Sequence, residues 1–157
     1  MQTLLLWVGK TNDSRLKSLT EDYTQRINRY QPLEILTLPE LKIKGKLPEK
    51  IQKEKEGKLI VEKIKKGDFV ILLDEKGKSF DSQNFSEYLN KKRASSSKRM
   101  VFVIGGPYGF SDEIYAIANE KIALSDMTFS HQMVRLLFLE QLYRANTILN
   151  NEPYHHQ

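Results

Sequence analysis

Short runs of hydrophobic residues alternate along the chain with stretches of helical periodicity. The apolar runs predict strands at residues 3–9, 33–38, 69–74, 100–104 and 121–124. The periodic stretches predict helices that begin at Asp13 or Ser14 and near residues 48, 82, 112 and 131, with Gly77 turning the chain after the third strand. The second of these helices is expected to reach Lys66 and the last to span about 131–149. This alternation predicts an α/β fold, with a mainly parallel sheet and helices on both of its faces, and residues 1–157 as one domain.

Three of the predicted strands end in unusual sequence. These ends are Leu73-Asp74, Ile104-Gly105-Gly106 and Leu124-Ser125-Asp126. Ligands of open parallel sheets bind beyond the carboxyl ends of the strands, near a topological switch point. We therefore expect any ligand site to form there.

The glycine loop in VFVIGGPYGFSDEI, residues 101–114, matches neither familiar phosphate-binding loop. Phe110 follows the last glycine where a P-loop needs lysine, and the glycine spacing differs from the dinucleotide fingerprint. Ser111, Asp112 and Glu113 occupy the following helix start, where they satisfy the helix dipole and repel another anion. The loop favours a neutral or cationic ligand such as an adenosine group, although a tight turn without any ligand explains it equally well.

The segment LSDMTFSHQMVR, residues 124–135, leads into the last helix. Ser130 is a candidate N-cap, and Asp126 and Thr128 can satisfy backbone donors as in any loop. Met127 and Phe129 place apolar side chains inside this polar segment. These two side chains need a packing partner, for which a flat purine ring is one candidate.

The last helix is apolar over two sectors of its surface. The broad sector contains Val134, Leu137, Phe138, Leu142, Ala145, Ile148 and Leu149, and the second contains Met133, Leu136 and Tyr143. One sector can pack on the sheet. The second predicts a homodimer interface, with burial under the C-terminal tail as the alternative.

Composition and charge narrow the possible functions. The 157 residues carry a net charge of +5 and no cysteine, which excludes disulfides, thiolate metal sites and a cysteine nucleophile. Lysines concentrate between Lys42 and Lys66, which fits a polyanionic partner or a solvated helix with i,i+4 ion pairs. No run of residues is long and apolar enough for a membrane span, so a cytoplasmic protein is expected. The adjacent His155 and His156 do not have metal-ligand spacing, and no metal is expected.

Three ordered motifs together resemble one known family. IGGPYGF, then LSDMTFSHQMVRLLFLEQLYRA, then the terminal PYHH are similar to the RlmH group of the SPOUT superfamily. Members of this group are methyltransferases that act on N3 of a pseudouridine in large-subunit ribosomal RNA. The resemblance covers essentially the whole chain. It implies an α/β fold with a C-terminal trefoil knot, an exception to the usual absence of knots.

The resemblance also implies a homodimer that binds S-adenosylmethionine in the knot and acts on the ribosome. The implied cofactor contacts are Leu73, Gly105, Leu124, Ser125, Asp126, Met127, Thr128 and Phe129. Arg144, Tyr154 and His155 match the polar residues near the transferred methyl group and the substrate base. S-adenosylmethionine carries a sulfonium and no phosphate, which agrees with the acidic helix start.

Two other functions remain open from the sequence. One is a ribosome-associated RNA-binding factor that keeps the knotted fold without catalysis. The other is a regulator that binds an adenine nucleotide. For the enzyme, the proton on the acceptor nitrogen could pass to His155, to a carboxylate or to solvent.

Overall fold

The computed structural model describes residues 1–42 and 45–156. The lysine-rich region between Lys42 and Lys66 therefore lies partly outside the described residues, at positions 43 and 44. The strands are β1 Gln2–Val8, β2 Leu33–Leu38, β3 Asp68–Ser79, β4 Arg99–Ile104 and β5 Glu120–Ala123. The helices are α1 Ser14–Ile27, α2 Glu49–Val61, α3 Ser82–Arg93, α4 Asp112–Ile117 and α5 Met133–Leu149. Strands and helices alternate as the sequence predicts.

The five strands form one sheet in the order β2-β1-β4-β3-β5, and every described pairing is parallel. The central strands are almost continuously apolar, as strands covered on both faces must be. Strands β1 and β3 are not neighbours, because β4 lies between them and pairs with both. The predicted α/β class with a parallel sheet is confirmed.

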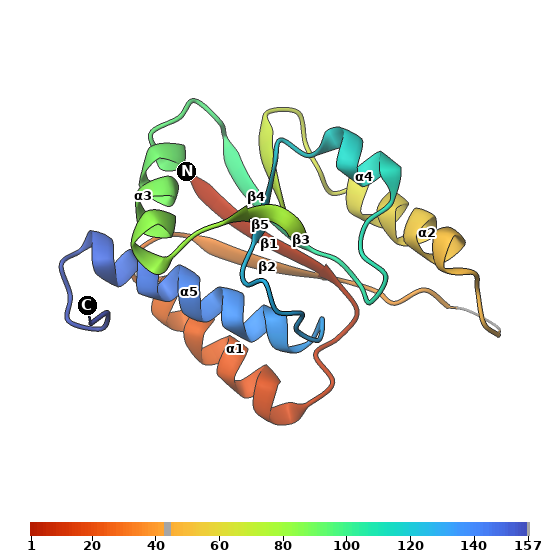
Figure 1. The fold of residues 1–157 in the computed structure, drawn as a ribbon, viewed down its shortest axis with the longest axis horizontal. Helices are drawn as coiled ribbons and strands as arrows, with labels where there is room; N and C mark the ends of the chain where they lie inside the picture. The colour runs from red at the N-terminus through yellow and green to blue at the C-terminus, as the bar shows by residue number, and fades with distance from the viewer. Residues whose placement is uncertain (43–44, 157) are drawn as a thin grey trace.

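Helices cover both faces of the sheet (Figure 1). On one face α1, α3 and α5 bury a core that includes Ile27, Leu89 and Phe138. On the other face α2 and α4 bury a smaller core with Ile60 and Ile114. Side chains of successive strand residues point alternately into the two cores, because a strand repeats every two residues. This layering leaves the carboxyl ends of the strands free to form a site.

Side-chain caps fix the starts of several helices. The Asp13 carboxylate accepts a hydrogen bond from the Arg15 N–H at 2.8 Å, and Asp81 caps α3 through the Asn84 N–H at 2.7 Å. Ser111 caps the short α4. Each cap satisfies backbone N–H groups that the first turn of a helix leaves without a partner.

The prediction that Gly77 turns the chain is wrong. Strand β3 runs through Gly77 to Ser79, and both Leu73 and Lys78 pair with Ile122 of β5. A Cβ atom at Gly77 would lie 2.5 Å from the backbone nitrogen of Ile122. Glycine is therefore required because β3 bends closely across β5, and the backbone approach takes the place of a turn.

The second and last helices are shorter than predicted. Helix α2 ends at Val61, not at Lys66, because the N–H groups of Lys63 and Ile64 bond three residues back and close the final turn. Helix α5 begins at Met133, and Gln132, not Ser130, stands at its N-cap.

The predicted apolar sectors of α5 are only partly correct. Phe138, Leu142 and Ala145 are buried as expected, but Leu139, which lies in neither predicted sector, is fully buried as well. Arg135 and Asn146 share this buried face, so hydrophobic periodicity alone could not locate it.

Candidate active site

The carboxyl ends of β3, β4 and β5 meet at one edge of the sheet. Leu73 of β3 lies opposite Ile104 of β4 on one side and Ile122 of β5 on the other. Gly105, the residue after Ile104, therefore lies near Leu73. Leu124 lies two residues after Ile122, directly after the end of β5. The structure thus brings together the three strand ends that the sequence singled out.

The glycine loop after β4 forms a tight turn. The N–H of Gly109 donates to the carbonyl of Gly106 at 3.1 Å, and Gly109 has a φ of +81°, which favours glycine. A Cβ atom on Gly105 would lie 3.2 Å from the ring of Phe110. Contacts within this chain therefore explain two of the loop glycines, Gly105 by its packing against Phe110 and Gly109 by its backbone conformation.

Acidic groups surround this loop. Asp112 and Glu113 occupy the first turn of α4, whose N-cap is Ser111. Glu56 of α2 also lies close to the loop, since one of its carboxylate oxygens would be 2.8 Å from a Cβ atom placed on Gly106. Burial raises the pKa of the Glu56 carboxyl, and a hydrogen bond from Gln52 partly opposes this rise. The electrostatic surroundings favour a cationic or neutral ligand over a phosphate.

The segment 124–129 runs along the same edge. The Ser125 hydroxyl accepts a hydrogen bond from the Met127 N–H at 3.0 Å, and the Thr128 hydroxyl donates to Glu75 of β3 at 3.5 Å. Met127 is 76% exposed and Phe129 is 39% exposed. The packing partner that the sequence predicts for these two side chains is therefore not supplied by this chain.

Polar contacts, some exposed and some buried, anchor the chain where this segment enters α5. The Gln132 amide accepts from the Asn12 N–H at 3.0 Å and donates to the carbonyl of Lys10 at 3.1 Å. The fully buried Arg135 donates to the carbonyls of Val8 and Gly9 at 2.9 and 3.0 Å. These bonds tie the segment to the end of β1. Ser130 also contributes, because its hydroxyl accepts from the Met133 N–H at 3.1 Å.

Arg144, Tyr154 and His155 come together at the far end of α5. The Arg144 guanidinium lies 4.7 Å from the centre of the Tyr154 ring and 3.1 Å from Nδ1 of His155. The ring of Tyr154 packs against Tyr143 at 4.7 Å, so the tail covers part of the second apolar sector of α5. The sequence motifs therefore identified a real side-chain cluster.

Glu140 organises this cluster, although no role is predicted for it from the sequence. Its Oε1 accepts from Arg144 Nη2 at 2.6 Å, from Arg144 Nε at 3.1 Å and from the Tyr154 hydroxyl at 3.1 Å. Desolvation, with help from the neighbouring Tyr23 hydroxyl, raises the pKa of Tyr154, so the phenol stays protonated. The i,i+4 spacing of Glu140 and Arg144 is the signal that could have found this residue.

The two groups of candidate residues lie at opposite ends of α5 within one chain. Segment 124–129 precedes Met133, whereas Arg144 is eleven residues further along the helix and the tail lies beyond it (Figure 1). At about 1.5 Å per residue, some 16 Å separate Met133 from Arg144 along the axis.

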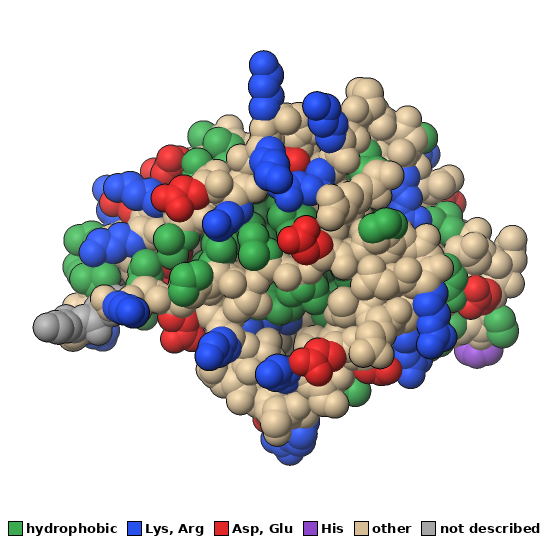
Figure 2. Space-filling model, turned by 180° about the vertical axis from the view of Figure 1, so that it is seen from behind, with side chains coloured by type: hydrophobic (Ala, Val, Ile, Leu, Met, Phe, Trp, Pro, Cys, Tyr) green, Lys and Arg blue, Asp and Glu red, His purple; other side chains and the backbone are tan. Residues whose placement is uncertain are grey.

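Basic and hydrophobic side chains share the rear surface of the protein (Figure 2). Lysines of α2, including Lys50, Lys55 and Lys58, are exposed. The described ion pairs do not include Glu54 with Lys58 or Glu62 with Lys66, so the i,i+4 pairing that would explain the lysines structurally does not form.

Within residues 1–42 and 45–156, no group of three His, Asp or Glu side chains could hold a metal ion. The described helices are also too short or too polar to cross a membrane.

The sequence profile of the family described as "Predicted SPOUT methyltransferase" matches residues 1–155. A solved structure of a probable methylase family protein from Haemophilus influenzae Rd KW20 has a similar fold, with a TM-score of 0.51 at 12% identity over 99% of this chain and 70% of that chain. By fold and profile, the chain is a SPOUT methyltransferase.

More similar relatives define the family more narrowly. The ribosomal RNA large subunit methyltransferase H of Parabacteroides distasonis is 53% identical over 157 residues, which is 100% of both chains. The protein of the same name from Flavobacterium johnsoniae is 55% identical over the same full length. Within the SPOUT methyltransferases, the chain belongs to the ribosomal RNA large subunit methyltransferase H family.

Proposed function

We propose that this protein transfers a methyl group from S-adenosylmethionine to N3 of a pseudouridine in the large-subunit ribosomal RNA. The observation that carries this proposal is the full-length identity of more than half with relatives that are named for that class of activity. The choice of N3 and of pseudouridine follows the motif resemblance. A ribosomal substrate also implies a cytoplasmic location. We further propose that residues 1–157 form one functional domain.

The edge formed by β3, β4 and β5 suits the cofactor. S-adenosylmethionine supplies a methyl group on a positively charged sulfur and has no phosphate. Glu56, Asp112 and Glu113 around the glycine loop favour such a cation. The exposed Met127 and Phe129 offer apolar surface to a purine. Leu73, Gly105 and the run from Leu124 to Phe129, with Ser125, Asp126 and Thr128, would hold the cofactor.

Arg144, Tyr154 and His155 would position the substrate base. Arginine nitrogens can only donate, so Nδ1 of His155 accepts from Arg144 and the neutral ring carries its proton on Nε2. His155 therefore presents a donor to the base. Glu140 is a poor proton acceptor, because Oε1 accepts three hydrogen bonds and Oε2 accepts one from Gln141. In this arrangement the N3 proton passes to solvent, and catalysis depends on positioning.

A homodimer would join the two groups of residues. The base-positioning cluster is too far from segment 124–129 within one chain to act on a methyl group held there. An antiparallel arrangement of two α5 helices would place Arg144 of one copy beside the cofactor segment of the other. Met133 on α5 and Leu19 on α1 are 40% and 45% exposed, which provides apolar surface for this contact.

The knot expected from the resemblance is also part of the proposal. Support comes from the pairing of Ile122 with both Leu73 and Lys78, a register shift that keeps both parts of β3 against β5. In the proposed topology the chain after β5 threads through the loop formed by the preceding segments. The threaded segment is then the one that holds the cofactor.

The test is methyl transfer to ribosomes that lack the modification. Purified protein is incubated with methyl-labelled S-adenosylmethionine and separately with ribosomes, isolated large subunits and free ribosomal RNA. Label in a single large-subunit RNA nucleotide, identified by mass spectrometry as a methylpseudouridine, is the expected result. No label in any particle would favour the RNA-binding factor, and a calorimetric preference for ATP over the cofactor would favour the nucleotide regulator.

A further inference from the structure

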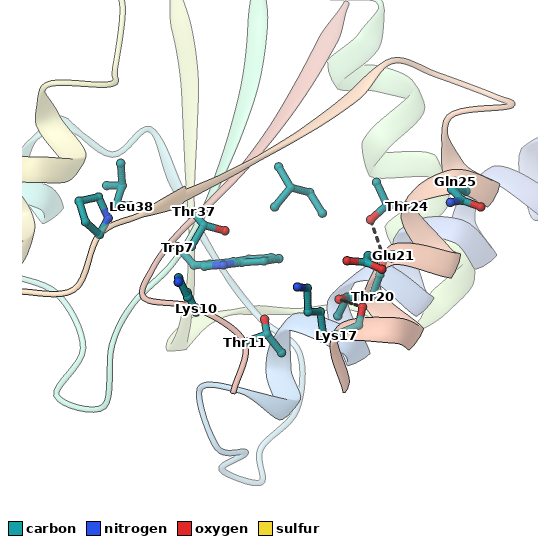
Figure 3. Close-up of a pocket in the computed structure, with 12 residues that line it drawn as sticks. Trp7, Lys10, Thr11, Lys17, Thr20, Glu21, Thr24, Gln25, Thr37 and Leu38 are labelled. Carbon is teal, nitrogen blue, oxygen red and sulfur yellow. Dashed lines mark hydrogen bonds between the residues drawn. The ribbon is translucent and has the colours of Figure 1, made fainter. Parts of the chain in front are cut away.

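A second cavity lies apart from the cofactor edge, between α1 and the ends of β1 and β2. Its volume is about 780 Å³, and Trp7, Lys10, Lys17, Thr24, Ile35 and Thr37 contribute to its walls. Figure 3 shows the indole of Trp7 extending across the middle of this space, with the Lys17 amino group directed toward it from α1. The walls are mostly apolar, and hydroxyl and amino groups surround them.

The indole N–H of Trp7 is buried and has no hydrogen-bond partner. Trp7 is only 4% exposed, and the Arg135 guanidinium lies 4.7 Å from the ring centre. Arg135 is itself held by the carbonyls of Val8 and Gly9 and by the Thr11 hydroxyl. A buried donor without an acceptor is rare in folded proteins and points to a ligand that completes the site after a small local opening.

The charges at the cavity suit a ligand that carries an anionic group. Lys10 and Lys17 are exposed at its mouth, and among the described lining residues only Glu21 is acidic. The hydroxyls of Thr20 and Thr24 on α1 already donate to backbone carbonyls, so they can only accept from a ligand, whereas Thr37 of β2 can donate or accept. A flat heterocycle with carbonyl acceptors and a phosphate matches these groups.

Side-chain contacts link the walls of this cavity to the helix that follows the candidate cofactor segment. Lys10 supplies the carbonyl that Gln132 binds, and Gln132 stands at the N-cap of α5, three residues after the cofactor segment. Arg135, one turn further along α5, packs on Trp7. A ligand in this cavity would therefore be linked to the segment proposed to hold the methyl donor through Gln132 and Arg135.

We propose that this cavity binds an unpaired nucleotide of the ribosomal RNA, separate from the nucleotide that is methylated. The base enters the apolar space over Trp7, and the phosphate contacts Lys10 and Lys17. The proposal rests on the proposed function, because it assigns a second contact to the same RNA substrate. Unpaired bases are the parts of RNA that proteins recognise through stacking and edge hydrogen bonds.

Trp7 is the only tryptophan of the chain, so its fluorescence reports on this cavity alone. The probes are a single-stranded oligouridylate, a single-stranded oligoadenylate, and the monophosphates UMP and AMP. We expect saturable quenching by an oligonucleotide and much weaker binding of the monophosphates. Lys17→Glu should weaken oligonucleotide affinity about tenfold at moderate salt. Arg29→Glu, an equal charge change at an exposed site outside the cavity, should leave the quenching curve almost unchanged.

Kinetics with ribosomes separates this inference from the proposed function. For Lys17→Glu we expect KM for ribosomes to rise about tenfold with kcat unchanged, whereas Arg29→Glu keeps both values. Wild-type KM in Lys17→Glu would overturn the nucleotide site while methyl transfer by the unaltered protein still supports the enzyme. Tighter binding of UMP or AMP than of either oligonucleotide would also overturn it, in favour of a site for free nucleotides. Absence of methyl transfer by the unaltered protein would instead contradict the proposed function.

Discussion

Arg144 donates a hydrogen bond to Nδ1 of His155 over 3.1 Å, and this bond joins the last helix to the C-terminal tail. The same guanidinium is held by Glu140, and this bond raises the pKa of Arg144 further above its already high ordinary value. Arg144 therefore stays charged at every physiological pH, and its bond to Nδ1 orients the His155 ring. The tail is thus held against α5, and hydrogen bonds to Arg144 and Glu140 fix the orientation of its polar side chains.

Loss of the cluster should reduce turnover without reducing cofactor affinity. For Arg144→Ala and His155→Ala we expect kcat to fall about 100-fold, because positioned hydrogen bonds to the reacting base disappear. S-adenosylmethionine affinity, measured by calorimetry, should stay close to the wild-type value, since the proposed cofactor contacts come from Leu73, Gly105 and segment 124–129 and the cluster contacts the substrate base. Arg15→Ala, which removes an exposed arginine of α1, serves as the control. Wild-type turnover in both variants would remove the cluster from the site.

Glu140→Gln tests whether orientation of Arg144 matters beyond its presence. The amide keeps one acceptor oxygen but loses the charge that holds the guanidinium. We expect an intermediate loss of kcat, about tenfold, with an unfolding midpoint close to that of the wild type, because a partly exposed i,i+4 ion pair stabilises the fold little. A loss of turnover that merely follows a loss of stability would indicate a structural role only.

Mixed dimers should test whether each site is shared between two chains. Gly105→Val and Arg144→Ala are each expected to be inactive. If one copy supplies the cofactor site and the other supplies Arg144, a dimer of one of each variant contains one complete site. When equal amounts of the two variants are mixed and exchange subunits, about half of the dimers are mixed, and each mixed dimer has one complete site of two. About a quarter of wild-type activity should therefore return. No recovery, with exchange verified by mass spectrometry, would contradict the shared site.

Gly105 should tolerate no branched side chain. A Cβ atom there would already lie 3.2 Å from the Phe110 ring, so Gly105→Val must displace the ring or the loop. We expect calorimetry to detect no cofactor binding for this variant and weakened binding for Gly105→Ala. Circular dichroism should show that both variants keep the fold. Wild-type affinity in Gly105→Val would remove this loop from the cofactor site.

The buried pair Asp68–Arg99 should make stability fall in acid. Burial alone would raise the pKa of Asp68, but hydrogen bonds from Arg99 and from the Lys65 N–H outweigh it and lower the pKa below 3.8. The folded state therefore binds the proton less readily than the unfolded state, and the stabilisation is present above pH 3.8 and lost below it.

Asp68→Asn should cost about 2–3 kcal/mol at pH 7 in urea unfolding, and the difference from wild type should shrink as the pH falls below 3.8. Asp22→Asn, which breaks the exposed pair with Arg26, should change stability little. A wild-type advantage over Asp68→Asn that is the same at pH 3 and pH 7 would contradict the linkage.

Much of the fold follows from local sequence, but the close approach of β3 and β5 does not. Apolar runs and caps such as Asp13 specify where strands and helices begin, because burial and capping act on neighbouring residues. Gly77 looked like a turn because glycine in a sequence gives no sign of which distant backbone will approach it. Only the position of Ile122 in the folded chain explains it.

The candidate site was predictable to different degrees in its two halves. Leu73, Gly105 and Leu124 could be predicted to lie together, because the carboxyl ends of parallel strands meet at one edge of the sheet. The cluster at the tail required motif resemblance, because nothing in the local pattern joins Arg144 to His155 across the end of a helix. Glu140 went unassigned because its role consists entirely of hydrogen bonds to other members of that cluster.

The most direct single measurement is a crystal structure of the protein with S-adenosylhomocysteine. The account predicts a dimer in which the adenosine lies against segment 124–129 and Gly105, with the sulfur facing Arg144 contributed by the second copy. A cofactor bound away from the edge formed by β3, β4 and β5, or an Arg144 remote from the sulfur in every copy, would contradict it.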